Sequence, residues 1–179
     1  MKQVTATILA VLFVFVIVTS AQAPPQMPQP APELKKLDYM VGTWSWEGDL
    51  KPSPFGPGGK ITGTDHVEWM QGGFFLVLHS KMKGAWGDGS SLAVMGYDPD
   101  EKVYTYQEFN SRGEHELSKG TVDGDTWSWN SDENVGGKKM KGRYSMKILS
   151  PTTYSFKFEL SPDGTDWNTV MDGKSTKLK

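Results

Sequence analysis

Three histidines, His66, His79 and His115, are the side chains in this sequence most suited to acid–base chemistry near neutral pH. His66 and Glu68 are two residues apart, so in a strand they share one face. The carboxylate could then orient the imidazole as a catalytic or metal-binding pair requires, or both side chains could belong to an exposed polar face. His79 follows an apolar run, which predicts that it is buried and hydrogen-bonded to a ligand or to a neighbouring strand. His115 lies between two glutamates that point to the opposite face, which is typical of a solvated edge.

The residue patterns of covalent and metal-dependent catalysis are missing from the sequence. It contains no cysteine, which excludes thiol catalysis, disulfides and cysteine-ligated metals. No two histidines have the local spacing of zinc ligands, and Asp98, Asp100, Asp123 and Asp125 are more simply turn formers than calcium ligands. A nucleophile elbow and a phosphate-binding glycine loop are also lacking. We therefore name no catalytic residue, predict no metal site and no cofactor, and treat an enzyme as the less favoured hypothesis.

Aromatic residues form the richest constellation, with seven Trp, six Tyr and eight Phe. Such rings fill the tapering interior of a small barrel, or line an apolar pocket when the interior is not completely filled. Trp44, early in the first expected strand, is predicted to plug the closed end of the barrel. The predicted ligand pocket has aromatic walls and two polar contacts, namely Trp69, Tyr106, Trp129, Tyr144 and Phe156, with Glu108 and His79.

The elements that must position these residues are ten short strands. Runs rich in aromatic and β-branched residues predict strands near 43–50, 60–71, 74–84, 91–97, 102–110, 114–122, 126–131, 139–149, 153–161 and 167–177. Tight reversals such as Asp98-Pro99-Asp100 and Asp123-Gly124 separate them, so neighbouring strands are expected to be antiparallel. Closure of such a meander removes its exposed edges. We therefore predict an all-β fold, a closed antiparallel up-and-down barrel of about ten strands.

Apolar periodicity indicates which faces of these elements are buried. Alternating large residues, for example Trp127 and Trp129, predict strands with one buried face. The run 74–78 is apolar at every position, which predicts a strand covered on both faces, with the N-terminal helix as one cover. That short helix is expected over 33–41, because Leu34, Leu37 and Met40 follow a proline at helical spacing.

The N-terminal region has the layout of a secretory signal peptide. Lys2 precedes an apolar run over 8–18 and the small-residue pattern Ala21-Gln22-Ala23, which predicts cleavage after Ala23. An uncleaved membrane anchor over 4–23 is the alternative. We expect three segments: a signal peptide over 1–23, a Pro-rich linker over 24–32 and the barrel domain over 33–179. The cleaved protein would be exported, periplasmic or extracellular, without stable insertion in a membrane.

Charge argues against nucleic acid as a partner. Acidic residues outnumber basic ones, 21 to 19, over the whole sequence, and removal of the signal peptide takes away Lys2. The densest basic cluster, over 138–143, lies beside a glycine-rich turn, where lysines discourage edge pairing of strands. No nucleic-acid partner is therefore predicted, and the sequence leaves the oligomeric state open.

Five short motifs resemble domain of unknown function 1579, a bacterial exported family similar to the calycin barrels, such as lipocalins and nitrobindin-like proteins. The resemblance covers roughly 37–176 and rests on the segments that begin with Gly42-Thr43-Trp44, Gly72-Gly73-Phe74, Gly96-Tyr97-Asp98, Gly120-Thr121-Val122 and Met171-Asp172-Gly173. It implies a small lipocalin-like barrel with an internal cavity and assigns no substrate. Nitrobindin-like proteins hold haem through a late histidine, whereas this sequence has no histidine after position 115. Haem bound in that manner is therefore not expected.

Three functions are compatible with these observations. The first, and favoured, is an exported barrel that binds a small apolar ligand in its interior. The second is an enzyme that uses the pair His66 and Glu68 within the same cavity. The third is an envelope protein that interacts through its outer surface, for which Trp86 in a glycine-rich hairpin would mark an exposed apolar patch.

Overall fold

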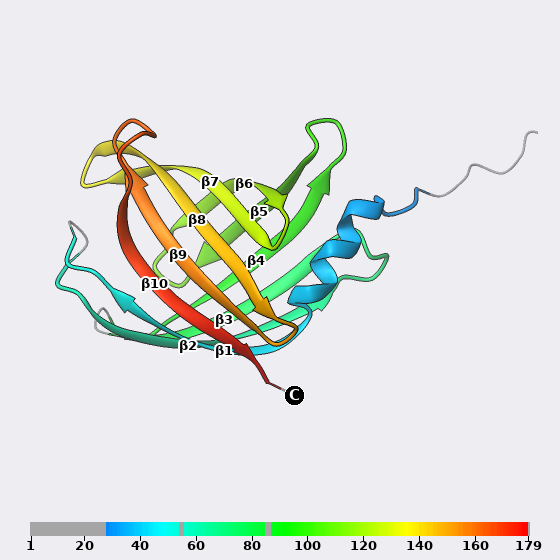
Figure 1. Ribbon diagram of the computed structural model, residues 1–179, viewed down its shortest axis with the longest axis horizontal. Helices are drawn as coiled ribbons and strands as arrows, with labels where there is room; N and C mark the ends of the chain where they lie inside the picture. Colours follow the sequence, from blue (N-terminus) through cyan, green and yellow to red (C-terminus); the bar gives the residue numbers. More distant parts are fainter. Residues whose placement is uncertain (1–27, 54–55, 85–86, 179) are drawn as a thin grey trace, which may run out of the picture.

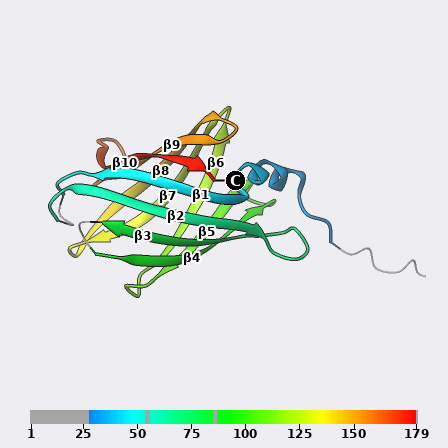
Figure 2. The same ribbon diagram turned by 90° about the horizontal axis from the view of Figure 1, so that it is seen from below.

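Ten antiparallel strands follow one another around a closed barrel, as the sequence predicts (Figure 1). The computed structural model describes residues 28–53, 56–84 and 87–178. Each strand pairs with its neighbours in chain order, and β1 pairs with β10 from Trp44 opposite Lys177 to Leu50 opposite Met171, which closes the ring (Figure 2). The strands are β1 (Gly42–Leu50), β2 (Gly59–Trp69), β3 (Leu76–Gly84), β4 (Gly89–Asp98), β5 (Val103–Asn110), β6 (His115–Asp123), β7 (Thr126–Val135), β8 (Lys138–Ser150), β9 (Thr153–Ser161) and β10 (Asn168–Lys177).

Alternation along the strands separates a buried inner face from a wetter outer face. Trp127 and Trp129 of β7 are 2% and 6% exposed, and the residue between them is only partly buried. The largest difference from the predicted boundaries is that β7 continues to Val135. Its polar end remains in the sheet because it pairs with β8, where Lys141 forms an ion pair with Asp132. Pairing with a partner strand thus outweighs the poor strand propensity of the local sequence.

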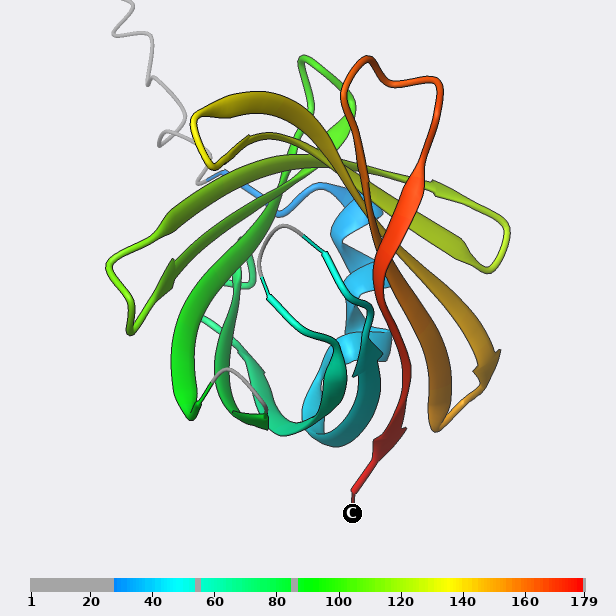
Figure 3. The same cartoon turned by 90° about the vertical axis from the view of Figure 1, so that its left-hand side faces the viewer.

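A short 3-10 helix, η1 (Pro32–Met40), closes one end of the barrel. Its buried residues, Leu34, Leu37 and Met40, are three apart, and a helix with three residues per turn places them on one face. They pack against Trp44 of β1, which is 2% exposed and donates a 2.8 Å hydrogen bond from Nε1 to the Met40 carbonyl. The prediction that Trp44 plugs the closed end is therefore confirmed. Figure 3 views the barrel from the opposite end, with η1 at the far side.

The run 74–78 is covered on one face only, by η1, so the expectation that both of its faces are covered is wrong. Strand β3 begins at Leu76, which is fully buried and belongs to the same core cluster as the helix, whereas Phe75 is 44% exposed. The helix closes the end of the barrel from the inside, so it packs on inward-facing residues. Phe75 instead lies across Gly96 of β4, where a side chain would clash with its ring.

Two predictions fall on residues outside the described part of the chain. The signal peptide over 1–23 and the first residues of the Pro-rich linker precede residue 28, and Trp86 lies in the undescribed segment 85–86. Within the described ranges, no helix has the length and apolar character needed to cross a membrane.

Candidate ligand-binding cavity

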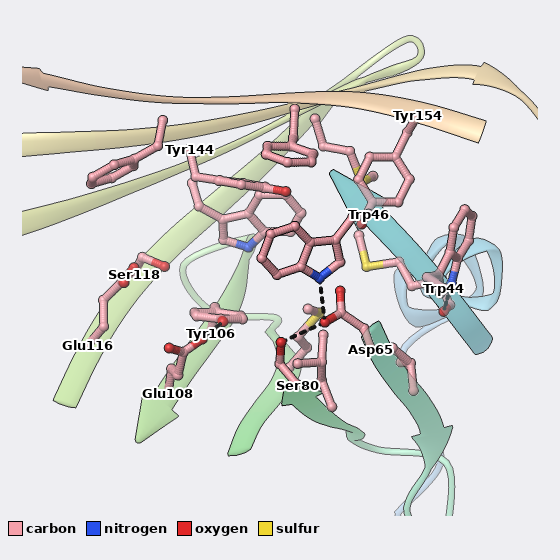
Figure 4. Close-up of a pocket in the computed structure, with 18 of the residues that line it drawn as sticks. Trp44, Trp46, Asp65, Ser80, Tyr106, Glu108, Glu116, Ser118, Tyr144 and Tyr154 are labelled. Carbon is pink, nitrogen blue, oxygen red and sulfur yellow. Dashed lines mark hydrogen bonds between the residues drawn. The ribbon is translucent and has the colours of Figure 1, made fainter. Parts of the chain in front are cut away.

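The barrel interior contains a cavity of about 320 Å³ next to the filled end. Met40 and Trp44 form its floor, and the space extends toward the opposite end, where Glu116 lies at the beginning of β6. Eight aromatic side chains contribute to its wall (Figure 4). Proteins typically bind small molecules in apolar cavities of roughly 300–1,000 Å³ that contain a few polar groups. The size and lining of this cavity fall in that class.

Five of the seven predicted pocket residues line this cavity. Tyr106 and Glu108 come from β5, Trp129 from β7, Tyr144 from β8 and Phe156 from β9. They face inward because each lies on the strand face that the alternation of large residues identifies as buried. Tyr144 stacks on Phe156 with ring centroids 6.1 Å apart and planes inclined by 17°. These rings form a continuous aromatic wall along neighbouring strands.

Two glutamates face the cavity directly opposite each other. Glu108 of β5 and Glu116 of β6 are register partners, so their Cβ atoms are on the order of 5 Å apart. Burial raises the pKa of both carboxyl groups, and for Glu116 it does so to about 7, with Glu133 and Glu108 adding repulsion. The Tyr106 hydroxyl donates a hydrogen bond to Glu108, which partly offsets the rise in the pKa of that residue.

A third carboxylate, Asp65 of β2, faces the cavity from another wall. Its Oδ1 accepts hydrogen bonds from Trp46 Nε1 at 3.0 Å and from the Ser80 hydroxyl at 2.7 Å (Figure 4). Burial nevertheless raises its pKa. The described lining contains no lysine, arginine or histidine, so the three carboxyl groups share the cavity without a protein cation.

A buried donor in the wall also lacks a partner. Trp129 is 6% exposed, and its Nε1 forms no hydrogen bond within the described residues. The nitrogen lies over Gly120 of β6, only 2.6 Å from where a Cβ would stand, so glycine is required beneath the indole. Leaving a buried N–H unpaired costs about 1–3 kcal/mol.

A family model described as "Protein of unknown function (DUF1579)" matches residues 29–177. The chain belongs to the DUF1579 family. The resemblance inferred from the sequence motifs is thus confirmed, and the match covers both η1 and the whole barrel. Among curated proteins, no relative matches the sequence.

Solved structures place the DUF1579 chain among lipocalin-like barrels. The Rv2717c protein from M. tuberculosis is similar with a TM-score of 0.60 and 15% identity, covering 84% of this chain and 100% of that one. The S-type phycobiliprotein lyase CPES from Guillardia theta has a TM-score of 0.58 and 9% identity, covering 81% and 92% respectively. At such low identity these likenesses establish the fold alone.

Two predicted pocket residues of the DUF1579 chain lie outside the cavity. Trp69 is partly buried beside the core of the filled end, and its Nε1 donates a 2.9 Å hydrogen bond to Asp38 of η1. His79 is exposed, so the expectation that it is buried is wrong. Its neighbours Leu78 and Ser80 line the cavity, which turns His79 outward. The preceding apolar run had no alternation from which this phase could be inferred.

The pair His66 and Glu68 also lies on the outer face of the DUF1579 barrel. Their side chains are 56% and 63% exposed, with Nε2 and Oε2 3.9 Å apart, so the hypothesis of a catalytic pair inside the cavity is wrong. His66 is the register partner of His79, and His115 is the partner of exposed Phe109, so all three histidines occupy outward positions. The described residues include no cluster of three or more potential metal ligands.

The polar wall contains residues that the sequence-based prediction missed, chiefly Asp65, Ser80, Glu116 and Ser118. A polar residue in a strand is ordinarily assigned to the solvent face, and these residues are common there. Position offers a usable signal, because Asp65 is two residues before buried Val67 and therefore shares its inward face.

Proposed function

We propose that this DUF1579 barrel binds a small, predominantly apolar molecule in its interior. The observation that supports the proposal is an unfilled cavity of about 320 Å³ beside the barrel end that η1 and Trp44 close. That volume corresponds to roughly ten water molecules, which the aromatic part of the wall holds poorly. An aromatic ligand would release this water and bury its surface against the rings.

The proposal includes a location outside the cytoplasm, which rests on the sequence over 1–23. Expression of the complete chain in a bacterium with an export pathway should yield a protein that starts at Pro24 and is recovered from the periplasm or the medium. Intact-protein mass measurement of that fraction checks the cleavage site. Recovery of only uncleaved chain with the membranes would contradict export in this form.

Binding can be tested with naphthalen-1-ylmethanol, a neutral bicyclic probe, by calorimetry and by quenching of tryptophan fluorescence. The wild-type protein should bind one probe molecule, whereas Ser118→Phe should bind it at least about tenfold more weakly because a new ring occupies the cavity. Leu117→Phe is the matched control, since Leu117 is 60% exposed on the outer face of the same strand. Equal affinity of both variants would contradict binding in the interior.

An outer-surface role is the second candidate, and an exposed apolar patch favours it. Leu92, Phe109 and Leu117 lie on the adjacent strands β4, β5 and β6 and are 40%, 50% and 60% exposed. Leu92 and Phe109 are direct register partners, so their side chains adjoin. For this role, Phe109→Ser should reduce cosedimentation with the cell-envelope fraction and leave probe binding unchanged. Unchanged cosedimentation would count against it.

A further inference from the structure

We infer that the cavity selects an organic cation, a protonated amine or comparable positive group carried on an aromatic body. The inference rests on the proposed function, because it names the ligand class for the same interior site. It follows from the charge of the cavity lining and the arrangement of its rings.

The first argument is the charge of the cavity lining. Asp65, Glu108 and Glu116 line the same cavity, and the described lining offers no cationic side chain to any of them. Glu108 and Glu116 face each other across neighbouring strands, an arrangement that destabilises a sheet when both carry charge. A cation from outside the protein would relieve this repulsion and pair with carboxylates in a medium of reduced polarity.

The second argument is the arrangement of the rings. In Figure 4, Tyr144, Tyr154 and Trp46 lie on one side of the cavity, whereas Glu108 and Glu116 lie on the other. A cation between these sides would contact carboxylates and ring faces together. Tyrosine and tryptophan rings attract cations through their faces, most strongly where water is excluded. The same rings would pack against the aromatic body of the ligand.

Protonation of Glu116 gives the inference a pH signature. The groups that face it are Glu108 of β5, Glu133 of β7 and Tyr106, none of which is a cation. A bound cation favours ionised Glu116, so binding releases a proton when the pH is near its pKa of about 7. Affinity for a cationic ligand should therefore rise between pH 5 and pH 8, whereas affinity for a neutral ligand should not.

Three probes with the same naphthalene ring test the inference: naphthalen-1-ylmethylamine, naphthalen-1-ylmethanol and 1-naphthoate. Calorimetry at pH 8 should show the amine binding about tenfold more tightly than the alcohol, and the naphthoate binding most weakly. Glu116→Gln and, separately, Glu108→Gln should reduce the preference for the amine to about twofold or less. Glu68→Gln is the control, because Glu68 is 63% exposed on the outer face.

The outcomes distinguish this inference from the proposed function. Equal binding of amine and alcohol, or tightest binding of naphthoate, would overturn selection of a cation and leave interior binding intact. Binding of none of the three probes would remove both. A preference for the amine that survives in both folded glutamine variants would also overturn the inference, and circular dichroism establishes that each variant is folded.

Discussion

Two glutamates, one on the outer face of the barrel and one facing its cavity, have contrasting environments. Glu159 of β9 is on the outer face and 5% exposed, and its carboxylate receives Arg143 Nη2 at 2.8 Å and Lys157 Nζ at 2.7 Å. Burial on its own raises its pKa, but the hydrogen bonds from Lys157 and Arg143 outweigh burial and lower it. Glu116 of β6 faces the cavity, where burial and the neighbouring Glu133 and Glu108 raise its pKa to about 7 and the described lining offers no cation to offset them.

The difference shows that basic side chains pair with a buried carboxylate on the outer face of the barrel, whereas the described cavity lining contains none. The Arg143 guanidinium is held 4.0 Å above the Trp167 ring, so the outer pair is fixed in place by packing as well as charge. An inner carboxylate without such a partner destabilises the empty protein when ionised. A positively charged ligand could then pair with this carboxylate, as expected of a binding site rather than of a structural ion pair.

The largest expected effect is a loss of stability when Glu159, on the outer face, loses one of its two cationic partners. Arg143→Ala should lower the free energy of unfolding by roughly 3 kcal/mol at pH 7, because it leaves Glu159 buried with only Lys157 as partner. Urea denaturation measures the change. Lys141→Ala is the control, because its ion pair with Asp132 is exposed and contributes about 0.5 kcal/mol or less. Similar losses in the two variants would contradict the distinction drawn for Glu159.

Ionisation of Glu116, which faces the cavity, should lower the stability of the protein as the pH rises. Because the folded protein protonates Glu116 near pH 7 and the unfolded chain protonates it near the ordinary value of 4.5, raising the pH removes protons from the folded state at a cost. Stability should therefore fall by roughly 2–3 kcal/mol between pH 5 and pH 8 through this group alone.

Glu116→Gln should remove most of that decline and make the protein more stable than wild type at pH 8. A weaker decline of stability with pH should remain in the variant, because the pKa values of Asp65 and Glu108 are also raised. Urea denaturation across this pH range provides the measurement. A variant with the same pH dependence as wild type would show that Glu116 is not the uncompensated inner group.

The sequence predicts the barrel well because its evidence for strands is local. Alternating rings such as Trp127 and Trp129 define one face without reference to other strands, and turn residues such as Asp123 and Gly124 separate the strands. Closure of β1 on β10 follows once the strands are sequential and antiparallel. These features depend on neighbouring residues, so a single sequence is sufficient to infer them.

The cavity is only partly predictable because its polar half contradicts ordinary burial preferences. Aromatic residues such as Tyr144 are expected inside, whereas Asp65 and Glu116 resemble solvent-facing residues until the strand phase is known. His79 shows the converse error, since an apolar run without alternation gives no phase and the histidine was assigned to the interior. The placement of inward acids depends on which strands become neighbours, which a single sequence does not display.

A moderate effect is expected where the inner wall does provide a partner. Tyr106→Phe removes the hydroxyl that donates to Glu108 and should cost about 1 kcal/mol of stability. It should also raise the pKa of Glu108 further, since that hydrogen bond favours the ionised form. Carbon-detected NMR titration of the glutamate carboxyl groups measures the pKa. Tyr144→Phe removes a cavity hydroxyl elsewhere on the wall, and an equal rise in that variant would contradict a direct effect of Tyr106.

The smallest effect on stability and ligand affinity is expected for an exposed carboxylate without a close ion-pair partner. Glu68 is 63% exposed, and its contact with His66 spans 3.9 Å, so water screens their attraction. His66→Ala should change the free energy of unfolding by about 0.5 kcal/mol or less, and the affinity for naphthalen-1-ylmethylamine should stay within about twofold of wild type. Urea denaturation and calorimetry measure the two quantities. Loss of amine binding in this variant would connect the outer histidines to the interior, and the contrast between inner and outer carboxylates would no longer explain ligand selection.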